Sequence, residues 1–150
     1  MFHPGTGFFS PGQTCLRPSP VFSALCTADN NGDLTFQVVE PSTISGVTGR
    51  VSGVGGAILF DDIVLAFPTI ADGQITPVTA PWLFIKTLRG GYLRDCASIE
   101  NGFSIAIDDS YSSEAFRLNI YTIADTPVSA EIFWKGRRIL SIVIENFAIL

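Results

Sequence analysis

Apolar and polar residues alternate with a period of two along much of the chain after Asp33. Three runs show it best, with these residues on one face: Phe103, Ile105 and Ile107; Phe116, Leu118 and Ile120; Val128, Ala130, Ile132 and Trp134. Because successive side chains of a strand point to opposite faces, this period is typical of β-strands with one buried face. We therefore expect strands over 103–107, 116–120 and 128–134.

Short turn signals separate the apolar runs. Two-residue hairpin turns need positive φ, which Gly, Asn and Asp adopt most easily. The candidate pairs are Asp72-Gly73, Gly90-Gly91, Asn101-Gly102 and, more weakly, Lys135-Gly136, with longer connections over 108–114 and 124–127. Such turns make consecutive strands antiparallel neighbours. The pattern predicts an all-β antiparallel meander of roughly eight to ten strands, forming a barrel or a sandwich.

Two segments are apolar on both faces when they are drawn as strands. In 81–88, Leu83 and Ile85 lie opposite Trp82 and Phe84, and in 138–150 both faces are largely apolar. An ordinary antiparallel strand exposes one face to water. We therefore expect the second face to be covered by the N-terminal segment, a second sheet or a neighbouring subunit.

Residues 1–30 differ in composition from the rest of the chain. Four of the nine prolines fall within the first twenty positions, so this segment is not a central strand. It is also too aromatic for a solvated linker, with Phe2, Phe8, Phe9 and Phe22. We interpret 1–30 as an extended arm whose phenylalanines dock on a neighbour, followed by a single β domain over 31–150.

Two adjacent carboxylates, Asp61 and Asp62, interrupt the apolar run 57–67. In one regular strand they would point to opposite faces, and at least one would enter an apolar layer at a cost of several kcal/mol. A bend, bulge or turn at the pair is the favoured interpretation. An ion pair with Arg50 or Arg94 and a catalytic carboxylate are the alternatives. The glycines before the run are followed by a strand pattern, and no Lys-Ser/Thr pair of a phosphate-binding loop follows them.

Composition and charge narrow the classes of partner. The chain is 47% hydrophobic and 15% charged, with a formal net charge of −5 and no basic run longer than Arg137-Arg138. A nucleic-acid binder needs a basic stripe, and an acidic chain is poorly suited to anionic membrane surfaces. We expect neither partner and no cofactor.

The cysteines and the N-terminal residues indicate the cellular compartment in which we expect the protein. Cys15, Cys26 and Cys96 form an odd set without a C-x-x-C pair, so we favour three reduced thiols, with a Cys15–Cys26 bridge as the alternative. The first residues lack the charged and apolar regions of a secretory signal. The expected location is the cytoplasm, or a particle assembled there.

No catalytic or metal-binding constellation is visible. His3 is the only histidine, which removes the usual base of a serine or cysteine nucleophile and ordinary histidine zinc sites. The Asp29–Asp33 segment resembles the start of a calcium loop, but its register is wrong, and a solvated turn is favoured. The remaining acids and tyrosines fit strand ends and turns: Asp95, Glu100, Asp108, Asp109, Tyr92, Tyr111 and Tyr121. We expect Arg89, Arg94 and Arg117 to lie in strands and pair with acids on neighbouring strands.

Two functions remain. The favoured one is a non-catalytic structural or interaction subunit of a homo-oligomer or larger assembly, such as a virion component, with itself or other subunits as partner. The alternative is a small lipocalin-like barrel that binds an apolar small molecule and promotes a cyclisation or isomerisation by shape alone. The residues that would line its cavity are Trp82, Phe84, Tyr92, Tyr121 and Trp134.

Overall fold

The computed structural model describes residues 2–5, 22–68 and 75–149. Its eleven strands form one antiparallel sheet in the order β6-β5-β4-β3-β2-β1-β11-β10-β9-β8-β7. The first strands are β1 (Phe2–Gly5), β2 (Ser23–Ala28), β3 (Leu34–Glu40), β4 (Thr48–Ser52), β5 (Gly55–Phe60) and β6 (Ile63–Phe67). The later strands are β7 (Tyr92–Ile99), β8 (Gly102–Asp108), β9 (Phe116–Ile123), β10 (Thr126–Trp134) and β11 (Arg137–Ile144). A 3-10 turn, η1 (Ser42–Ile44), follows β3, and the helix α1 (Ala80–Gly90) precedes β7.

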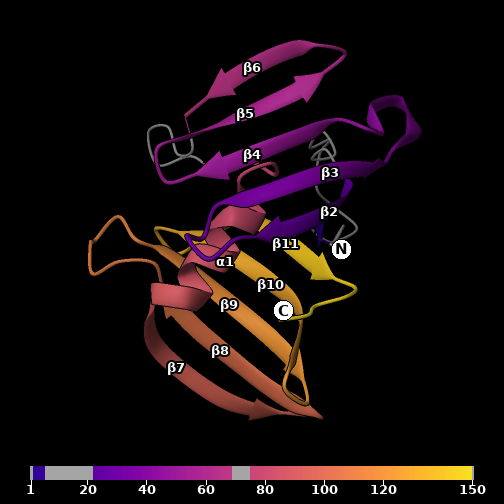
Figure 1. The fold of residues 1–150 in the computed structure, drawn as a ribbon. Helices are drawn as coiled ribbons and strands as arrows, with labels where there is room; N and C mark the ends of the chain where they lie inside the picture. Colours follow the sequence, from indigo (N-terminus) through magenta and orange to yellow (C-terminus); the bar gives the residue numbers. More distant parts are fainter. Residues whose placement is uncertain (1, 6–21, 69–74, 150) are drawn as a thin grey trace, which may run out of the picture.

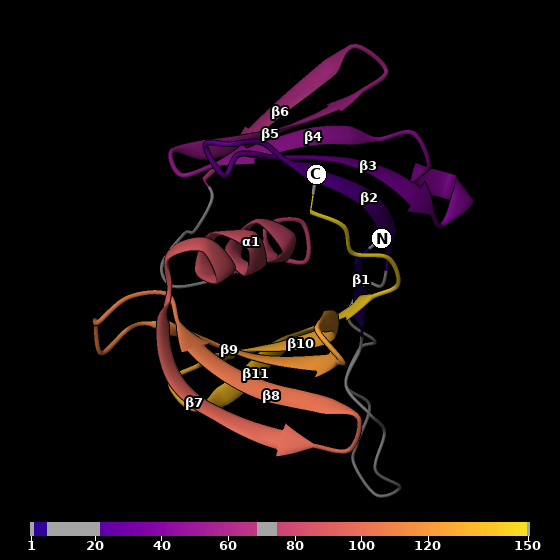
Figure 2. The ribbon, with the colours of Figure 1, turned by 60° about the horizontal axis from the view of Figure 1, so that its bottom comes forward.

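The sheet consists of two five-stranded meanders joined by one short strand. Consecutive strands are neighbours within β2–β6 and within β7–β11, and β1 pairs with both β2 and β11. The two halves face each other across α1, which lies between them (Figures 1 and 2). The prediction of an all-β antiparallel meander is confirmed. Its halves are layered as in a sandwich, yet they belong to one continuous sheet whose described edges are β6 and β7.

The helix corrects the prediction of a strand over 81–88. Pro81 stands in the first turn of α1, where its missing N–H costs nothing. The preceding turn is closed by Thr76 and Thr79, whose hydroxyl oxygens lie 3.1 Å apart. At the other end, the Gly91 N–H donates to the Thr87 carbonyl at 2.8 Å. The paired glycines, predicted as a hairpin turn, are instead the end of this helix. Burial between two sheet layers outweighs the β-propensity of its aromatic residues.

The centre of the core is the contact between α1 and both halves of the sheet. Leu83 and Phe84 are fully buried, and α1 packs against β2, β8 and β11. The buried partners include Ala24, Phe36, Leu118, Ile120, Ile132 and Ile142. Beyond the strands, Phe147 meets Phe84 edge to face, with ring centroids 6.5 Å apart. The second apolar face predicted for 81–88 is thus covered from within the chain. Within the described part of the chain, no helix has the length and hydropathy needed to cross a bilayer.

The predicted hairpin turns have different outcomes. Lys135 and Gly136 join β10 to β11 with φ of 49° and 75°, as predicted. The β7–β8 turn is shifted by one residue, because Ile99 pairs with Gly102 and the turn residues are Glu100 and Asn101. The connection predicted over 124–127 is a two-residue turn, since Ile123 pairs with Thr126. Asp72-Gly73 lies outside the described residues.

The predicted alternation is clearest in β9. Phe116, Leu118 and Ile120 are buried, whereas the intervening Arg117 is exposed. On the outer face, Arg117 contacts Asp108 of β8, as expected for paired strands. Similarly, Arg138 of β11 donates to Glu131 of β10 at 2.6 Å. This half of the sheet therefore has one apolar face and one polar face.

Parts of the segment interpreted as an arm belong to the sheet. Residues 2–5 form β1, which is paired on both sides, and residues 23–28 form β2 between β1 and β3. Phe22 is buried in the core, at 9% exposure. Phe8 and Phe9 lie outside the described residues, as does the side chain of Phe2, so their docking on a neighbour stays a prediction.

Candidate functional site

Asp61 and Asp62 form the two-residue turn that joins β5 to β6. Their φ values are 45° and 65°, and Phe60 pairs with Ile63 directly before and after them. This is the geometry of a type I′ hairpin, which Asp tolerates better than most residues. Both carboxylates are exposed, so neither enters an apolar layer. The favoured prediction of a turn at this pair is confirmed, and Arg50 pairs with Asp33 instead, at 2.6 Å.

Two glycines before the hairpin are required by aromatic rings that lie over them. A Cβ at Gly49 would stand 2.4 Å from the Phe36 ring, and one at Gly56 would stand 2.3 Å from the Phe67 ring. Gly49 pairs with both Phe36 and Ile58, and Gly56 pairs with Phe67. Paired residues share a face of a sheet, so these rings lie on the core side. The glycines allow close ring packing.

The core side of the hairpin is an uncovered apolar surface, which we call the hairpin's inner face. It consists of Ile58, Phe60, Ile63, Leu65 and Phe67, placed on one side by the β5–β6 register. Ile58 and Phe67 pack against the core, whereas Phe60, Ile63 and Leu65 are 45%, 60% and 62% exposed. The inner face is therefore continuous with the hydrophobic core, but part of it is exposed to solvent.

The opposite face of the same hairpin is also apolar. Leu59 and Val64 are paired and are 46% and 64% exposed. Soluble monomers seldom expose contiguous large apolar side chains without a functional reason. In Figure 1 the β5–β6 hairpin forms one end of the molecule, away from β7–β11. The hairpin is accordingly the leading candidate for contact with an apolar partner.

Three of the five aromatics predicted to line a cavity contribute to core packing. Trp82 and Phe84 are buried on α1. Trp134 of β10 packs beside Phe116, with ring centroids 6.5 Å apart, and its Nε1 donates to the Glu114 carbonyl at 3.2 Å. The helix α1, which carries Trp82 and Phe84, lies between the two halves, and the lining of a ligand cavity by these residues stays a prediction.

The remaining two aromatics lie on the outer face of the β7–β11 half. Tyr121 donates to Glu131 at 3.0 Å, and burial together with that carboxylate raises the pKa of its hydroxyl. Tyr92 contacts Tyr111, with ring centroids 3.6 Å apart and the rings tilted by 36°. The structure thus places Trp82, Phe84 and Trp134 in one apolar core cluster and Tyr92 and Tyr121 on the outer surface.

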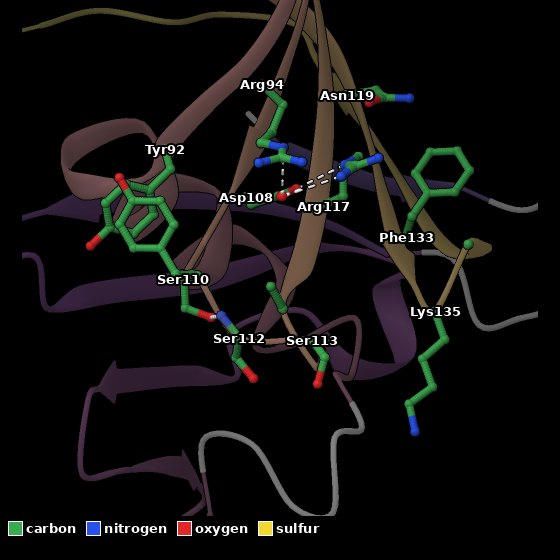
Figure 3. A pocket seen from close by; sticks show the side chains of 13 residues that line it. Tyr92, Arg94, Asp108, Ser110, Ser112, Ser113, Arg117, Asn119, Phe133 and Lys135 are labelled. Carbon is green, nitrogen blue, oxygen red and sulfur yellow. Dashed lines mark hydrogen bonds and ion pairs between the residues drawn. The ribbon is translucent and has the colours of Figure 1, made fainter.

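An outer groove of about 650 Å³ lies beside Tyr92, between β7–β10 and the loop 109–115 (Figure 3). Figure 3 shows the Tyr92 side chain at one end, Arg94, Asp108 and Arg117 along one wall, and Ser110, Ser112 and Ser113 on the loop. Asp108 accepts two hydrogen bonds from Arg117, at 2.8 and 3.2 Å, and lies 3.3 Å from Nε of Arg94. The Asp108 contact raises the pKa of Arg117. Of the cross-strand arginine pairs that we predicted, those of Arg94 and Arg117 are confirmed.

The segment that resembles a calcium loop is a structural turn between β2 and β3. Asp29 accepts hydrogen bonds from the N–H groups of Asn31 and Asp33, at 2.8 and 3.1 Å. Arg89 lies on α1 rather than in a strand, and its guanidinium binds the Asp29 carbonyl at 2.8 Å. These contacts use the oxygens that a cation would need. The described residues hold no group of three or more His, Cys, Asp or Glu side chains arranged for a metal.

The cysteines of the described chain are free thiols in contrasting surroundings. Cys96 is exposed, whereas burial raises the pKa of Cys26 to about 12. Cys15 lies outside the described residues, so the predicted state of all three thiols is not decided.

Sequence reasoning missed the inner face as a site. The apolar run 57–67 was considered only for the turn at Asp61 and Asp62. The available signal was the run of apolar residues on both faces of 57–60 and 63–67, the same feature that was noted elsewhere in the chain. The loop serines gave no signal, because an isolated Ser-rich turn is a common surface connection.

Comparison with known proteins gives little further information. No family model and no curated protein sequence matches the chain. Among solved structures, a LolA superfamily protein from Nitrosomonas europaea is similar at 14% identity, with a TM-score of 0.45 over 99% of this chain and 69% of that one. A score below 0.5 does not establish a common fold, so function has to be argued from the residues themselves.

Proposed function

We propose that this protein binds an apolar molecule, with an acyl chain or an equivalent hydrocarbon portion, against the hairpin's inner face. The observation that carries the proposal is the exposure of three neighbouring large apolar residues, Phe60, Ile63 and Leu65, on the side of the sheet that forms the core in the central strands. A ligand bound there would pack next to the existing hydrophobic core and cover apolar surface that is continuous with it. Each Å² of apolar surface that it covers stabilises the complex by about 25 cal/mol.

The position of α1 explains why the surface stays uncovered. The helix packs against β2, β8 and β11, which lie near the middle and the far half of the sheet. The sheet continues through β4 and β5 to the edge strand β6 beyond that contact. The inner face is therefore left exposed at the open edge, where no strand of the described chain pairs with β6.

Binding of a fluorescent C16 fatty acid to the purified protein tests the proposal. Replacement of Leu65 by Gln removes apolar surface from the inner face, and we expect at least about a tenfold loss of affinity, equivalent to 1.4 kcal/mol. The matched control is Leu93→Gln on β7, because Leu93 is 67% exposed and belongs to the other half of the sheet. Affinity lost equally in both variants, or no saturable binding by the unaltered chain, would overturn the proposal.

A second candidate function, association of copies through β6, is favoured by a separate observation. This edge strand has no charged residue and is unpaired on one side, which is the arrangement that recruits another strand. It corresponds to the homo-oligomer expected from the sequence, which stays a prediction.

A proline separates the two candidates. Ile63 closes the hairpin turn by pairing with Phe60, so the backbone N–H of the next residue, Val64, points away from β5. Val64→Pro should therefore block pairing of β6 with another copy while the hairpin is retained. If native mass spectrometry shows oligomers that this change converts to monomers, and the fatty acid does not bind, association is the function. If the unaltered chain is monomeric when it binds the fatty acid, association is excluded as the function.

A further inference from the structure

The outer groove beside Tyr92 has a local charge opposite to that of the chain. Two guanidiniums, of Arg94 and Arg117, share the single carboxylate of Asp108. Among the residues that line the groove, Arg94, Arg117 and Lys135 are cationic and Asp108 is the one acid. The lining is therefore positive, although the net charge of the chain is −5 and Asp95 lies next to Arg94 outside the lining.

The two guanidiniums of the lining are accessible from the groove. The Arg94 and Arg117 side chains are 54% and 48% exposed, whereas Asp108 is only 13% exposed. Asp108 holds the two guanidiniums together and leaves further N–H groups of each unused, because a guanidinium has five N–H donors. A guanidinium pair of this kind matches the oxygens of a carboxylate or phosphate group.

The opposite wall supplies hydroxyl donors. The Ser110 oxygen accepts from the Ser112 N–H, and the Ser112 oxygen accepts from the Glu114 N–H, at 3.4 and 3.1 Å. Each hydroxyl keeps its own hydrogen for donation. The loop that carries them is held to β10 by the bond from Trp134 to Glu114. The donors therefore belong to a loop that is anchored at the groove.

An aromatic platform lies at the end of the groove. The Tyr92 and Tyr111 rings are in contact at an interplanar angle of 36°, and Tyr111 is 80% exposed. An exposed aromatic ring on a polar surface gains stability by stacking with a further planar group. The groove volume of about 650 Å³ lies within the range of small-molecule sites, about 300–1,000 Å³.

We propose that this groove binds a small aromatic oxyanion, a phosphate monoester or carboxylate attached to a planar ring. The oxyanion lies on Arg94 and Arg117 and accepts from the serine hydroxyls, while its ring stacks on Tyr111. The site is on the outer face of β7–β10, separate from the hairpin's inner face, so it does not depend on the proposed binding of an apolar molecule.

The test is an NMR titration of the full chain with phenyl phosphate, inorganic phosphate and benzoate at low ionic strength. We expect saturable shifts at the groove residues, with phenyl phosphate bound more tightly than inorganic phosphate. Arg94→Gln should weaken the binding of phenyl phosphate about tenfold, because the substitution removes the positive charge beside the ligand. The matched control is Arg50→Gln, an equally exposed arginine that pairs with Asp33 on the other half.

Two more variants sharpen the result. Asp108→Asn removes the carboxylate that competes with the ligand, so we expect phenyl phosphate to bind several-fold more tightly. Tyr111→Leu should reduce affinity for phenyl phosphate and leave that for inorganic phosphate unchanged. Melting temperatures establish that each variant is folded. The proposal is wrong if Arg50→Gln weakens binding as much as Arg94→Gln, if Asp108→Asn binds no tighter, or if no probe saturates.

Discussion

The two halves of the sheet follow the same pairing rules but differ in how completely they are covered. In β7–β11 the inner face of β8 and β11 meets α1, and Leu93 on the inner face of the edge strand β7 is exposed. The outer face of this half carries ion pairs such as Arg117–Asp108 and Arg138–Glu131. In β2–β6 the central strands are similar, but the terminal hairpin is apolar on both faces. A strand with one polar face has to bury only its apolar face. A strand that is apolar on both faces exposes apolar surface that a partner can cover, and in this chain that surface lies on the β5–β6 hairpin at one edge of the sheet.

The largest difference between the halves should appear when their inner faces are truncated. Phe84→Ala removes a ring that is fully buried between both halves, and we expect a loss of about 3–5 kcal/mol in the free energy of unfolding. Phe60→Ala on the inner face should cost less than about 1.5 kcal/mol, because its ring is 45% exposed. Urea denaturation measures both. Equal losses would show that the hairpin is packed as tightly as the core.

Gly49 tests the close packing that connects the hairpin to the core. A methyl group there would lie 2.4 Å from the Phe36 ring and 2.8 Å from the Ala57 carbonyl oxygen. Gly49→Ala should therefore destabilise the protein by about 1–3 kcal/mol. Gly53→Ala is the control, since no atom lies within 4 Å of its added Cβ, and its effect should stay within about 0.5 kcal/mol. A harmless Gly49→Ala would refute this account of the glycine.

The hairpin turn can be strengthened without any change to the apolar surface. Asp62 has a φ of 65°, a conformation that favours glycine, so Asp62→Gly should stabilise the protein by about 1 kcal/mol. Asp62→Ala should destabilise it, because alanine is strained at this φ. Thermal unfolding measures both changes. Opposite signs are expected, and equal signs would contradict a type I′ turn.

The smallest effect concerns the two described thiols. Burial raises the pKa of Cys26 from 9.0 to about 12, so its thiolate is scarce at pH 8, whereas the side chain of Cys96 is exposed to solvent. A thiol-alkylating reagent should modify Cys96 first, as read by peptide mass. The folded state holds this proton more tightly than the unfolded state. The stability that Cys26 contributes is therefore complete below pH 9.0 and falls as the pH rises toward 12. Faster modification of Cys26 would mean that β2 opens readily.

Much of the sheet could be predicted from local signals. Asp61-Asp62 and Lys135-Gly136 were identifiable as turns, because few residues adopt positive φ between two apolar strands. The alternation in β9 likewise predicted its buried residues, because one face of the strand packs on the core and the other faces solvent. These features depend on neighbouring residues only, and sequence reasoning therefore identified them.

The helix could not be predicted from the same signals. Residues 81–88 are rich in aromatic and branched side chains, and nothing local shows that a second sheet layer will lie above them. Pro81 followed ten residues later by Gly91 was the available indication of a helix start and end. The hairpin's inner face could not be predicted as a site for the same reason, because the exposure of Phe60, Ile63 and Leu65 depends on which strands α1 covers.

The most direct measurement of the account is a map of intermolecular NOEs between a bound saturated fatty acid and methyl-labelled protein. The account predicts contacts from the acyl chain to the methyl groups of Ile63 and Leu65, with Ile58 at the boundary with the core, and none to the exposed Leu93 and Ile123 of the other half. An acyl chain that contacts the other half, or that gives no contact to the hairpin, would contradict the claim that the hairpin's inner face is the binding surface.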